Sequence, residues 1–276
     1  MPVVADHPRA LTARTMLNKV PEVTVAFWVV KIMATTVGET AADYLAVDLK
    51  LGLTATTWVM AGLLAAALVF QFRARRYVPA VYWLAVVFIS VVGTLITDNL
   101  TDRFGVALAV TTTLFTIAML ATFAAWYASE GTLSIHTIYT TRREAFYWSA
   151  ILFTFALGTA AGDYLAETLD IGYLRSGLLF ASLIGLVALA YFVFKISEVL
   201  AFWMAYILTR PLGASIGDYT SQPRHAGGLG LGTTVTSFGF LVVIVGLVAW
   251  FTVQQRHTDA AVLEDPSPRP ADLTPR

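Results

Sequence analysis

The chain has 276 residues, of which 57% are hydrophobic and only 13% are charged, with zero net charge at pH 7 and no cysteine. Its mean hydropathy of +0.70 is far above that of a soluble domain, and several apolar runs reach the roughly 20 residues that a helix needs to cross a bilayer. The lack of cysteine excludes disulfides and thiolate metal sites. The balanced charge gives no reason to expect a nucleic-acid partner.

The composition therefore predicts an all-α membrane protein. Residues 1–22 are expected to form a cytoplasmic N-terminal tail without a signal-peptide pattern, and residues 256–276, rich in proline and charge, a disordered cytoplasmic tail. Eight transmembrane helices are predicted between the tails, four on each side of a cytoplasmic linker at residues 128–145. They lie at 24–45, 53–72, 79–100 and 105–127 in the first part (23–127), and at 146–166, 172–194, 199–219 and 233–253 in the second (146–255).

Basic residues in the loops predict the orientation. The side of the membrane with both termini would carry Arg9, Arg14, Lys19, Arg73, Arg75, Arg76, Arg142, Arg143, Lys195, Arg256, Arg269 and Arg276. The other side would carry Lys50, Arg103, Arg175, Arg210 and Arg224. The excess of Lys and Arg marks the cytoplasmic side. We therefore expect both termini in the cytoplasm and the protein in a bacterial inner membrane.

A short motif recurs four times in the odd-numbered spans: a glycine, three residues, a small residue, an aspartate, and then tyrosine or asparagine. The copies are Gly38 to Tyr44, Gly93 to Asn99, Gly158 to Tyr164 and Gly213 to Tyr219. The glycines are 55, 65 and 55 residues apart, so each repeat holds two helices and all four repeats share one topology. This spacing predicts four parallel two-helix repeats in two pseudo-symmetric halves.

The motif glycines (Gly38, Gly93, Gly158 and Gly213) have a structural explanation. Small residues four apart let two helices approach closely in lipid. The alternative is a break in the helix that bares carbonyls to a ligand, which Pro211 makes most plausible in the seventh span.

The four motif aspartates are harder to explain by packing. Asp43, Asp98, Asp163 and Asp218 sit at equivalent depth near the C-terminal ends of their helices, where the helix dipole disfavours an anion. They could meet water at the outer mouth. Ionisable groups within spans more often mark pathways or relays, so we expect a shared ion-binding site.

The first repeat carries further charges. Lys31, Thr35, Glu39 and Asp43 follow one another at four-residue intervals on one face. Glu39 would be the deepest ligand or a proton carrier, with Lys31 and Arg210 as counter-charges. A bound cation or protonated carboxyls would relieve the excess of negative charge. For Asp218 and Arg210, contact with outside water is an equal alternative.

The donor atoms restrict the ligand. Carboxylates and hydroxyls suit hard divalent cations or protons, and the lack of intramembrane histidine argues against a dedicated zinc or copper site. We therefore expect a divalent cation, held by Glu39 and the four aspartates, but no other cofactor. Hydroxyl-rich turns at the start of the even-numbered spans could complete such a site or bond to their own backbone. Hydrolase and nucleotide-binding motifs are absent, so we predict no enzymatic activity.

The segment Lys31 to Tyr44, together with Gly158 to Tyr164, resembles a bacterial family of inner-membrane proteins catalogued as a repeat of unknown function. The resemblance covers residues 24 to about 253. It is weaker where Gly-Glu is replaced by Gly93-Thr94 and Gly213-Ala214. It implies an integral membrane protein built from repeats, and it implies no activity.

Three functions remain open. The first is a transporter of a hard divalent cation, Mn²⁺ or Mg²⁺, with or without proton coupling. The second is a non-transporting sensor or partner subunit with a structural cation or proton site. The third is a carrier of an organic cation, with an aromatic rim at Tyr44, Tyr164 and Tyr219. The expected partners are the lipid bilayer and a small cation or proton, and homo-oligomerisation is left open.

Overall fold

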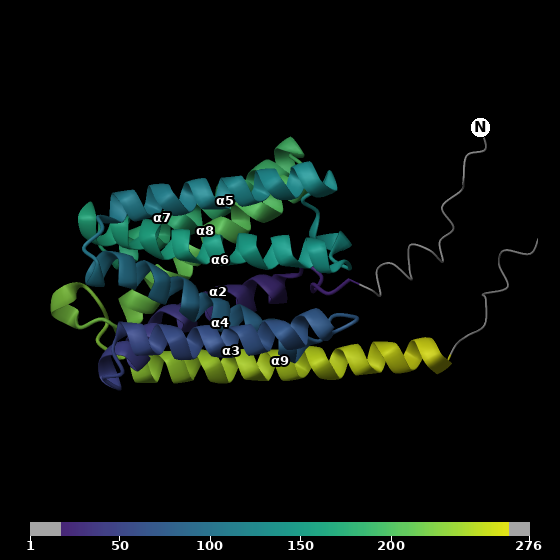
Figure 1. Cartoon of the computed structure of the whole chain (residues 1–276), viewed down its shortest axis with the longest axis horizontal. Coiled ribbons are helices and arrows are strands. Elements are labelled where there is room, and N and C mark those ends of the chain that lie inside the picture. The colour runs from purple at the N-terminus through teal and green to yellow at the C-terminus, as the bar shows by residue number, and fades with distance from the viewer. Residues whose placement is uncertain (1–17, 265–276) are drawn as a thin grey trace, which may run out of the picture.

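The computed structural model describes the backbone of residues 18–264 and the side chains of residues 18–254. All regular elements in this part of the chain are helical (Figure 1). The α-helices are α2 (Val25–Asp43), α3 (Leu53–Arg73), α4 (Pro79–Asp98), α5 (Leu108–Glu130), α6 (Thr141–Asp163), α7 (Tyr173–Phe194), α8 (Glu198–Ser221) and α9 (Thr233–Glu264). Within residues 18–264, eight helices are long and apolar enough to cross a membrane, which confirms the predicted helical class and the eight predicted spans.

Three of the helices that carry the motif change from α-helical to π-helical winding directly after the motif aspartate. Short π-helical segments follow α2, α4 and α6 at η1 (Tyr44–Asp48), η2 (Asn99–Arg103) and η4 (Tyr164–Thr168). The helix α8 has no such segment and continues to Ser221 with Pro211 inside it. Single turns of 3₁₀ helix, η3 (Ile135–Thr137) and η5 (Arg224–Ala226), lie in two of the loops.

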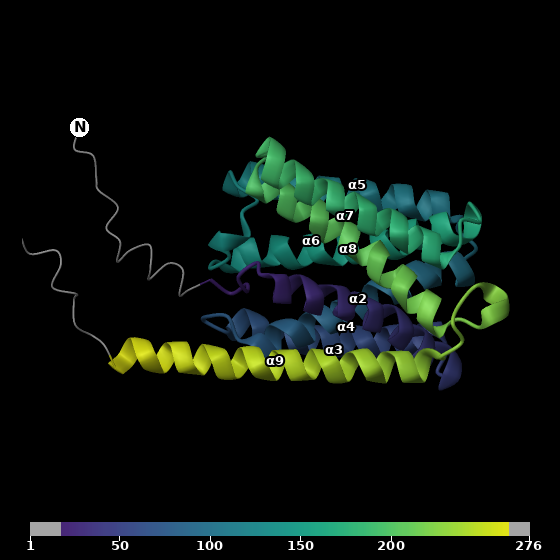
Figure 2. The ribbon, with the colours of Figure 1, turned by 180° about the vertical axis from the view of Figure 1, so that it is seen from behind.

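The helices form two concentric rings. The inner ring consists of α2, α4, α6 and α8, each packed against the next, with α8 packed against α2. Figures 1 and 2 show the helices from two opposite sides, running roughly along the long axis of the molecule. The outer helix of each repeat packs on the inner helix of the following repeat: α3 on α4, α5 on α6, α7 on α8, and α9 on α2. Four repeats therefore close into one pseudo-fourfold ring, within which the two predicted halves are α2–α5 and α6–α9.

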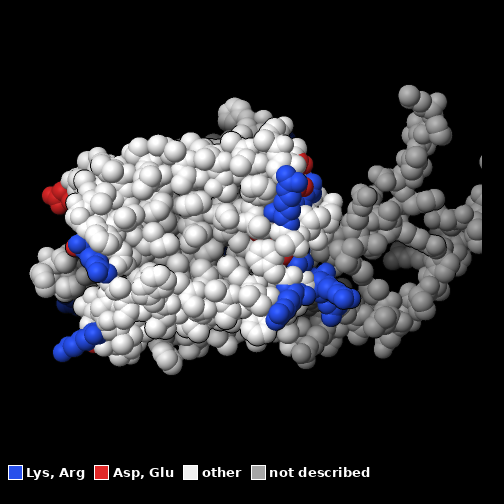
Figure 3. All heavy atoms as spheres, in the orientation of Figure 1, with Lys and Arg blue, Asp and Glu red and all other residues white. Residues whose placement is uncertain are grey.

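Burial separates the two rings. The inner spans are between 56% and 67% buried inside the protein, and the outer spans between 11% and 22%. The outer faces are apolar, and Figure 3 shows the charged side chains at the two ends of the molecule with an uncharged surface between them. Such a belt is the surface that lipid covers, which supports a membrane-spanning arrangement.

The motif glycines lie where neighbouring inner helices touch. A Cβ on Gly38 would stand 1.8 Å from Ser90 Oγ, and a Cβ on Gly213 would stand 1.8 Å from Thr35 Oγ1. Gly93 meets Phe155 and Gly158 meets Arg210 in the same way. Each motif glycine thus accommodates the side chain three residues before the motif glycine of the adjacent helix. The packing explanation of these glycines accounts for this geometry.

A circle of aromatic side chains, called the aromatic ring below, closes the inner bundle near the N-termini of the inner helices. A tryptophan stands ten residues before each motif glycine and another aromatic residue eleven before it: Phe27 and Trp28, Tyr82 and Trp83, Tyr147 and Trp148, Phe202 and Trp203. Each of the four pairs contacts the next around the ring, with ring centroids 5.6–6.2 Å apart. Trp83, Trp126, Trp148 and Trp203 are buried inside the protein, and Trp28 is half-buried.

Two of the expected boundaries need correction. Lys19, predicted in a solvated tail, is buried and its Nζ lies 2.6 Å from Glu144 Oε2 and 3.0 Å from the carbonyl of Phe72. The segment around it is thereby fastened to α3 and α6. At the other terminus, α9 continues as a helix through Glu264, into the predicted disordered tail. The remaining parts of both tails, residues 1–17 and 265–276, lie outside the described residues.

Candidate functional site

A cavity of about 200 Å³ opens at the end of the inner ring where the four motif aspartates lie. All five acids singled out from the sequence line it. The full lining is Glu39, Asp43, Asp98, Thr101, Asp102, Leu108, Asp163, Glu167, Asp218 and Gln222. No basic residue belongs to the lining, and Leu108 is its one apolar member. The repeats therefore converge their carboxyl groups on one polar space.

The four motif aspartates form one layer of this cavity. Each comes from a different inner helix, five residues after its motif glycine, so the ring symmetry places them at one depth. Asp218 is buried, and Asp43, Asp98 and Asp163 are half-buried. Within the described residues, none of these carboxylates makes a hydrogen bond or ion pair with a protein group. Their oxygens face the cavity.

Two acids of the cavity escaped the sequence analysis. Asp102 and Glu167 are exposed at its mouth, nine residues after the motif glycines of the second and third repeats. Gln222 holds the same position in the fourth repeat. Aligning the repeats beyond the motif would have shown this polar position. The π-helical segments η2 and η4 carry both acids, and π-helical turns often occur at functional sites.

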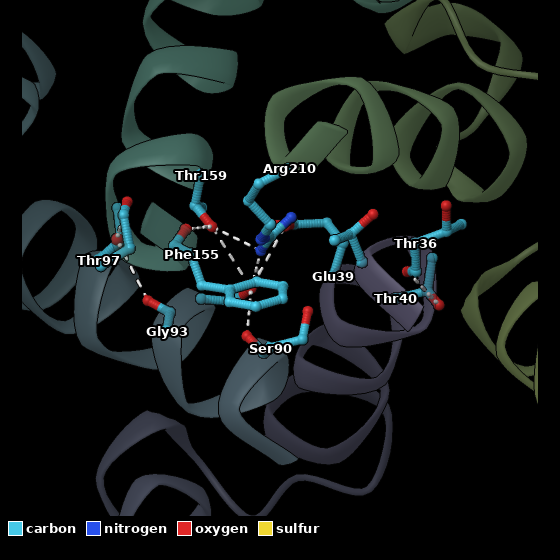
Figure 4. A network of polar contacts seen from close by, with 12 residues as sticks. Thr36, Glu39, Thr40, Ser90, Gly93, Thr97, Phe155, Thr159 and Arg210 are labelled. Atoms are coloured by element: carbon cyan, nitrogen blue, oxygen red, sulfur yellow. Dashed lines mark hydrogen bonds and ion pairs between the residues drawn. The ribbon is translucent and has the colours of Figure 1, made fainter. Parts of the chain in front are cut away.

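Beneath the aspartates, the centre of the ring holds a buried ion pair. The Arg210 side chain is fully buried, and its Nη2 lies 2.8 Å from Glu39 Oε2. The same nitrogen donates to Thr159 Oγ1 at 2.6 Å and to the Thr94 hydroxyl (Figure 4). Glu39, Thr94 and Thr159 directly follow their motif glycines, so Arg210 reaches equivalent positions in the three other repeats. Ala214 is the fourth member of this layer.

The counter-charge of Glu39 is therefore Arg210, and Lys31 does not share that role. Lys31 lies two turns below Glu39 on α2 and is 1% exposed. Its Nζ has no hydrogen-bond partner among the described residues and stands 4.4 Å from the centroid of the Phe155 ring and 4.2 Å from that of Tyr206. Aromatic faces stabilise this cation. Arg210, also counted among the basic residues of the outer side, lies in the bundle interior.

The supporting positions are packing positions. Thr35 donates to the carbonyl of Ile32 at 2.6 Å and fills the space beside Gly213. The alternative explanation, a helix break near Pro211, does not apply, because α8 is continuous there. The hydroxyl groups at the start of the even-numbered spans bond mainly to their own backbone, as for Thr56, Thr111 and Thr236, and none of them lines the cavity.

The metal site predicted at Glu39 and the four aspartates has no preformed ligand set among the described residues. Among the described residues, no three histidine, aspartate or glutamate side chains stand close enough together to hold one metal ion. The acids surround a space and do not converge on a point. A cation in this cavity would therefore keep much of its water, as Mg²⁺ commonly does in proteins. The aromatic rim expected at Tyr44, Tyr164 and Tyr219 is likewise not part of the lining.

The fold and the cavity define a helical membrane protein made of four two-helix repeats around an acidic central site. The chain belongs to the family described as Repeat of Unknown Function (DUF347), which matches residues 26–77, 81–132, 146–197 and 201–257. The four matches coincide with the four repeats of the ring and confirm the resemblance found in the sequence. No curated protein and no solved structure matches the chain.

Proposed function

We propose that this protein is a membrane transporter of a small hydrated cation, with the divalent cations Mg²⁺ and Mn²⁺ as first candidates. One observation carries the proposal. Seven carboxyl groups, carried by α2, α4, η2, α6, η4 and α8, line one cavity whose lining includes no basic residue. Mutual repulsion among the carboxylates is relieved when cations or protons bind. A cleft lined by charges of one sign also concentrates the opposite ion.

The shape and lining of the cavity favour an inorganic ion. Its volume of about 200 Å³ is many times the ~10–15 Å³ that one water molecule needs on the same measure. The space thus accommodates an ion with its hydration shell. An organic cation would gain from aromatic or apolar walls, and this lining offers only Leu108.

The test is cation uptake into proteoliposomes across a panel of metals. Glu39→Gln and Asp43→Asn each remove one negative charge from the cavity lining, and we expect each to reduce uptake several-fold. Asp170→Asn is the matched control, since Asp170 is exposed, lies at the same end of the protein and is not part of the lining. Its positive φ of 53° suits asparagine. Unchanged uptake in both cavity variants would remove the acids from the pathway.

A second candidate function is a sensor or partner subunit that binds a cation without moving it. The layers behind the cavity favour this alternative. Arg210, Lys31 and the aromatic ring follow one another between the cavity and the opposite end of the inner helices. Stabilisation of the purified protein by a cation, combined with no flux in proteoliposomes, would select this function. Flux that also dissipates a pH gradient would instead support proton-coupled transport.

We also propose that the protein sits in a bacterial inner membrane with both termini in the cytoplasm, so that the cavity opens on the opposite side. The support is the clustering of basic residues at the terminal end. Because the chain has no cysteine, single cysteines can report orientation. An impermeant thiol reagent added to intact cells should label Phe104→Cys and spare Glu22→Cys, both sites being exposed. The reverse labelling pattern would contradict the proposal.

A further inference from the structure

We infer that Arg210 is a tethered cation that occupies the place on Glu39 which an incoming cation must take. This inference rests on the proposed function and specifies how the site works. Its starting observation is that Glu39 belongs to two environments at once. The carboxylate lines the acidic cavity, and one of its oxygens accepts the hydrogen bond from Arg210 Nη2 at 2.8 Å. A cation that reaches the bottom of the cavity therefore competes with the guanidinium for the same carboxylate.

The guanidinium group of Arg210 is only partly hydrogen-bonded. Only Nη2 is engaged, and it serves Glu39, Thr94 and Thr159 together. Nε and Nη1 are buried and have no partner among the described residues. An arginine that serves only to hold a fold usually pairs with a carboxylate through two parallel hydrogen bonds. A buried guanidinium with two unsatisfied nitrogens is held weakly for its position, which suits a group that must be displaced.

The stem of Arg210 is fixed while its tip is not. A Cβ on Gly158 would stand 2.6 Å from Arg210 Cβ and 2.2 Å from its Cγ, so the stem fills the space that this glycine leaves. The guanidinium carbon lies 5.7 Å from the centroid of the Phe155 ring (Figure 4). Movement away from Glu39 is thus a rotation of the terminal bonds, with α8 and α6 in place.

The surroundings of Lys31 offer the displaced guanidinium no alternative carboxylate, which favours its return to Glu39. Lys31 lies two turns below Glu39 on α2 with its Nζ 4.4 Å from the centroid of the Phe155 ring, buried and without a hydrogen-bond partner among the described residues. Neither ring contact of Lys31 supplies a negative charge, so a guanidinium released from Glu39 meets no second carboxylate there. Arg210 therefore neutralises Glu39 whenever the cavity is empty. The ion exchanges with an internal positive charge, and the Glu39 carboxylate is paired both with and without the ion.

The experiment compares cation binding by the full-length wild type and Arg210→Met in detergent, with Mg²⁺ and Mn²⁺ as probes and the cation-dependent rise in melting temperature as the readout. Removing the competitor should lower the half-saturating cation concentration by about tenfold or more, because the competing state no longer reduces the apparent affinity. Uptake into proteoliposomes should fall at the same time. The variant should melt below the wild type without cation and recover when cation is added.

A chemical rescue gives an independent readout. Guanidinium ion at millimolar concentration should stabilise Arg210→Met, in which the place on Glu39 is vacant, and should not stabilise the wild type. Arg210→Lys keeps the charge but offers a different donor geometry, so its cation affinity should fall between the other two. This variant keeps the test decisive if Arg210→Met cannot be purified.

The outcomes separate the two proposals. If neither the wild type nor the Arg210 variants respond to any cation, both the proposed function and the tethered cation are wrong. If the wild type binds a cation and both Arg210 variants bind it equally or more weakly, only the tethered cation is wrong. Tighter binding in Arg210→Met together with rescue by guanidinium supports both.

Discussion

The two ends of the inner ring repeat the same residue type in every copy, and the layers between them do not. At one end each repeat contributes an aspartate, and at the other each contributes a tryptophan and a second aromatic residue. Between these ends, the residues that follow the motif glycines are Glu39, Thr94, Thr159 and Ala214. The layer below contains Arg210 and the next one Lys31.

This difference separates what builds the ring from what makes it specific. The aspartates and the tryptophans occur in all four repeats, so they do not distinguish one repeat from another. A single glutamate bound by a single arginine breaks that symmetry and gives the cavity one distinguishable carboxylate. The middle layers therefore carry the individuality of the site, and the ends provide its frame. Variants at the ends and in the middle should differ accordingly.

The largest effect on stability is expected at the buried ion pair between Lys19 and Glu144, which lies far from the cavity. Glu144→Gln leaves the buried ammonium of Lys19 without its carboxylate, at a cost of about 3–5 kcal/mol when one partner of a buried ion pair is removed. Cation affinity should not change. Unfolding measured by a reversible detergent titration, together with cation titration, checks both statements. A large loss of cation affinity would contradict the separation between frame and site.

A smaller loss is expected where the inner helices touch. Gly38→Ala places a Cβ 1.8 Å from Ser90 Oγ, and overpacking of this kind costs about 1–3 kcal/mol. Gly62→Ala is the matched control on α3, because nothing lies within 4 Å of its added Cβ. This control should be neutral or stabilising by up to about 1 kcal/mol through better helix propensity. Equal melting temperatures for the two variants would show that the inner contact is not tight.

The smallest effects are expected for single substitutions in the aspartate layer. Asp43→Asn, Asp98→Asn and Asp163→Asn each remove one of several charges that act together on a hydrated ion. Each should weaken cation binding by only about two- to fivefold, which corresponds to roughly 0.4–1 kcal/mol. The three values should agree closely, whereas Glu39→Gln should stand apart. Cation titrations of the four variants, monitored by melting temperature, decide whether the layer is equivalent or has a dominant member.

Much of the frame could be predicted from the sequence. Hydropathy gave the helices, and the intervals between the motif glycines gave the repeats, because both are local periodicities. The four aspartates were found because they recur at one position of the motif, and Glu39 because it is a charged residue inside a span that no other repeat shares. The tryptophan ring was missed although its signal is equally regular. A tryptophan near the end of a span is also typical of a side chain at the membrane surface, so its position in the span does not by itself indicate a buried ring of tryptophans.

The pairing of charges could not be predicted in the same way. Lys31 and Arg210 were both predicted as counter-charges of Glu39, Lys31 because it shares a helix face with Glu39, and the sequence does not show which of the two makes the contact. Arg210 reaches Glu39 only because α8 closes against α2, and a close contact at Gly158 directs its stem. Such a pairing depends on the order of helices around the ring. Had the repeats been placed in a cycle first, the layer of residues that follow the glycines would have shown the partners of Arg210.

The closing of the ring has a consequence for how the protein is made. The last helix, α9, packs on the first, α2, and α8 completes the contact with α2 that surrounds Arg210 and Glu39. During synthesis, α2 through α7 are made before α8 and α9, the helices that complete these contacts with α2. Until then Glu39 lies in an open bundle without its partner, because Arg210 is translated 171 positions later. The central ion pair thus forms as one of the final events of assembly, and a nascent chain that stops before α8 has an acidic site without its internal cation.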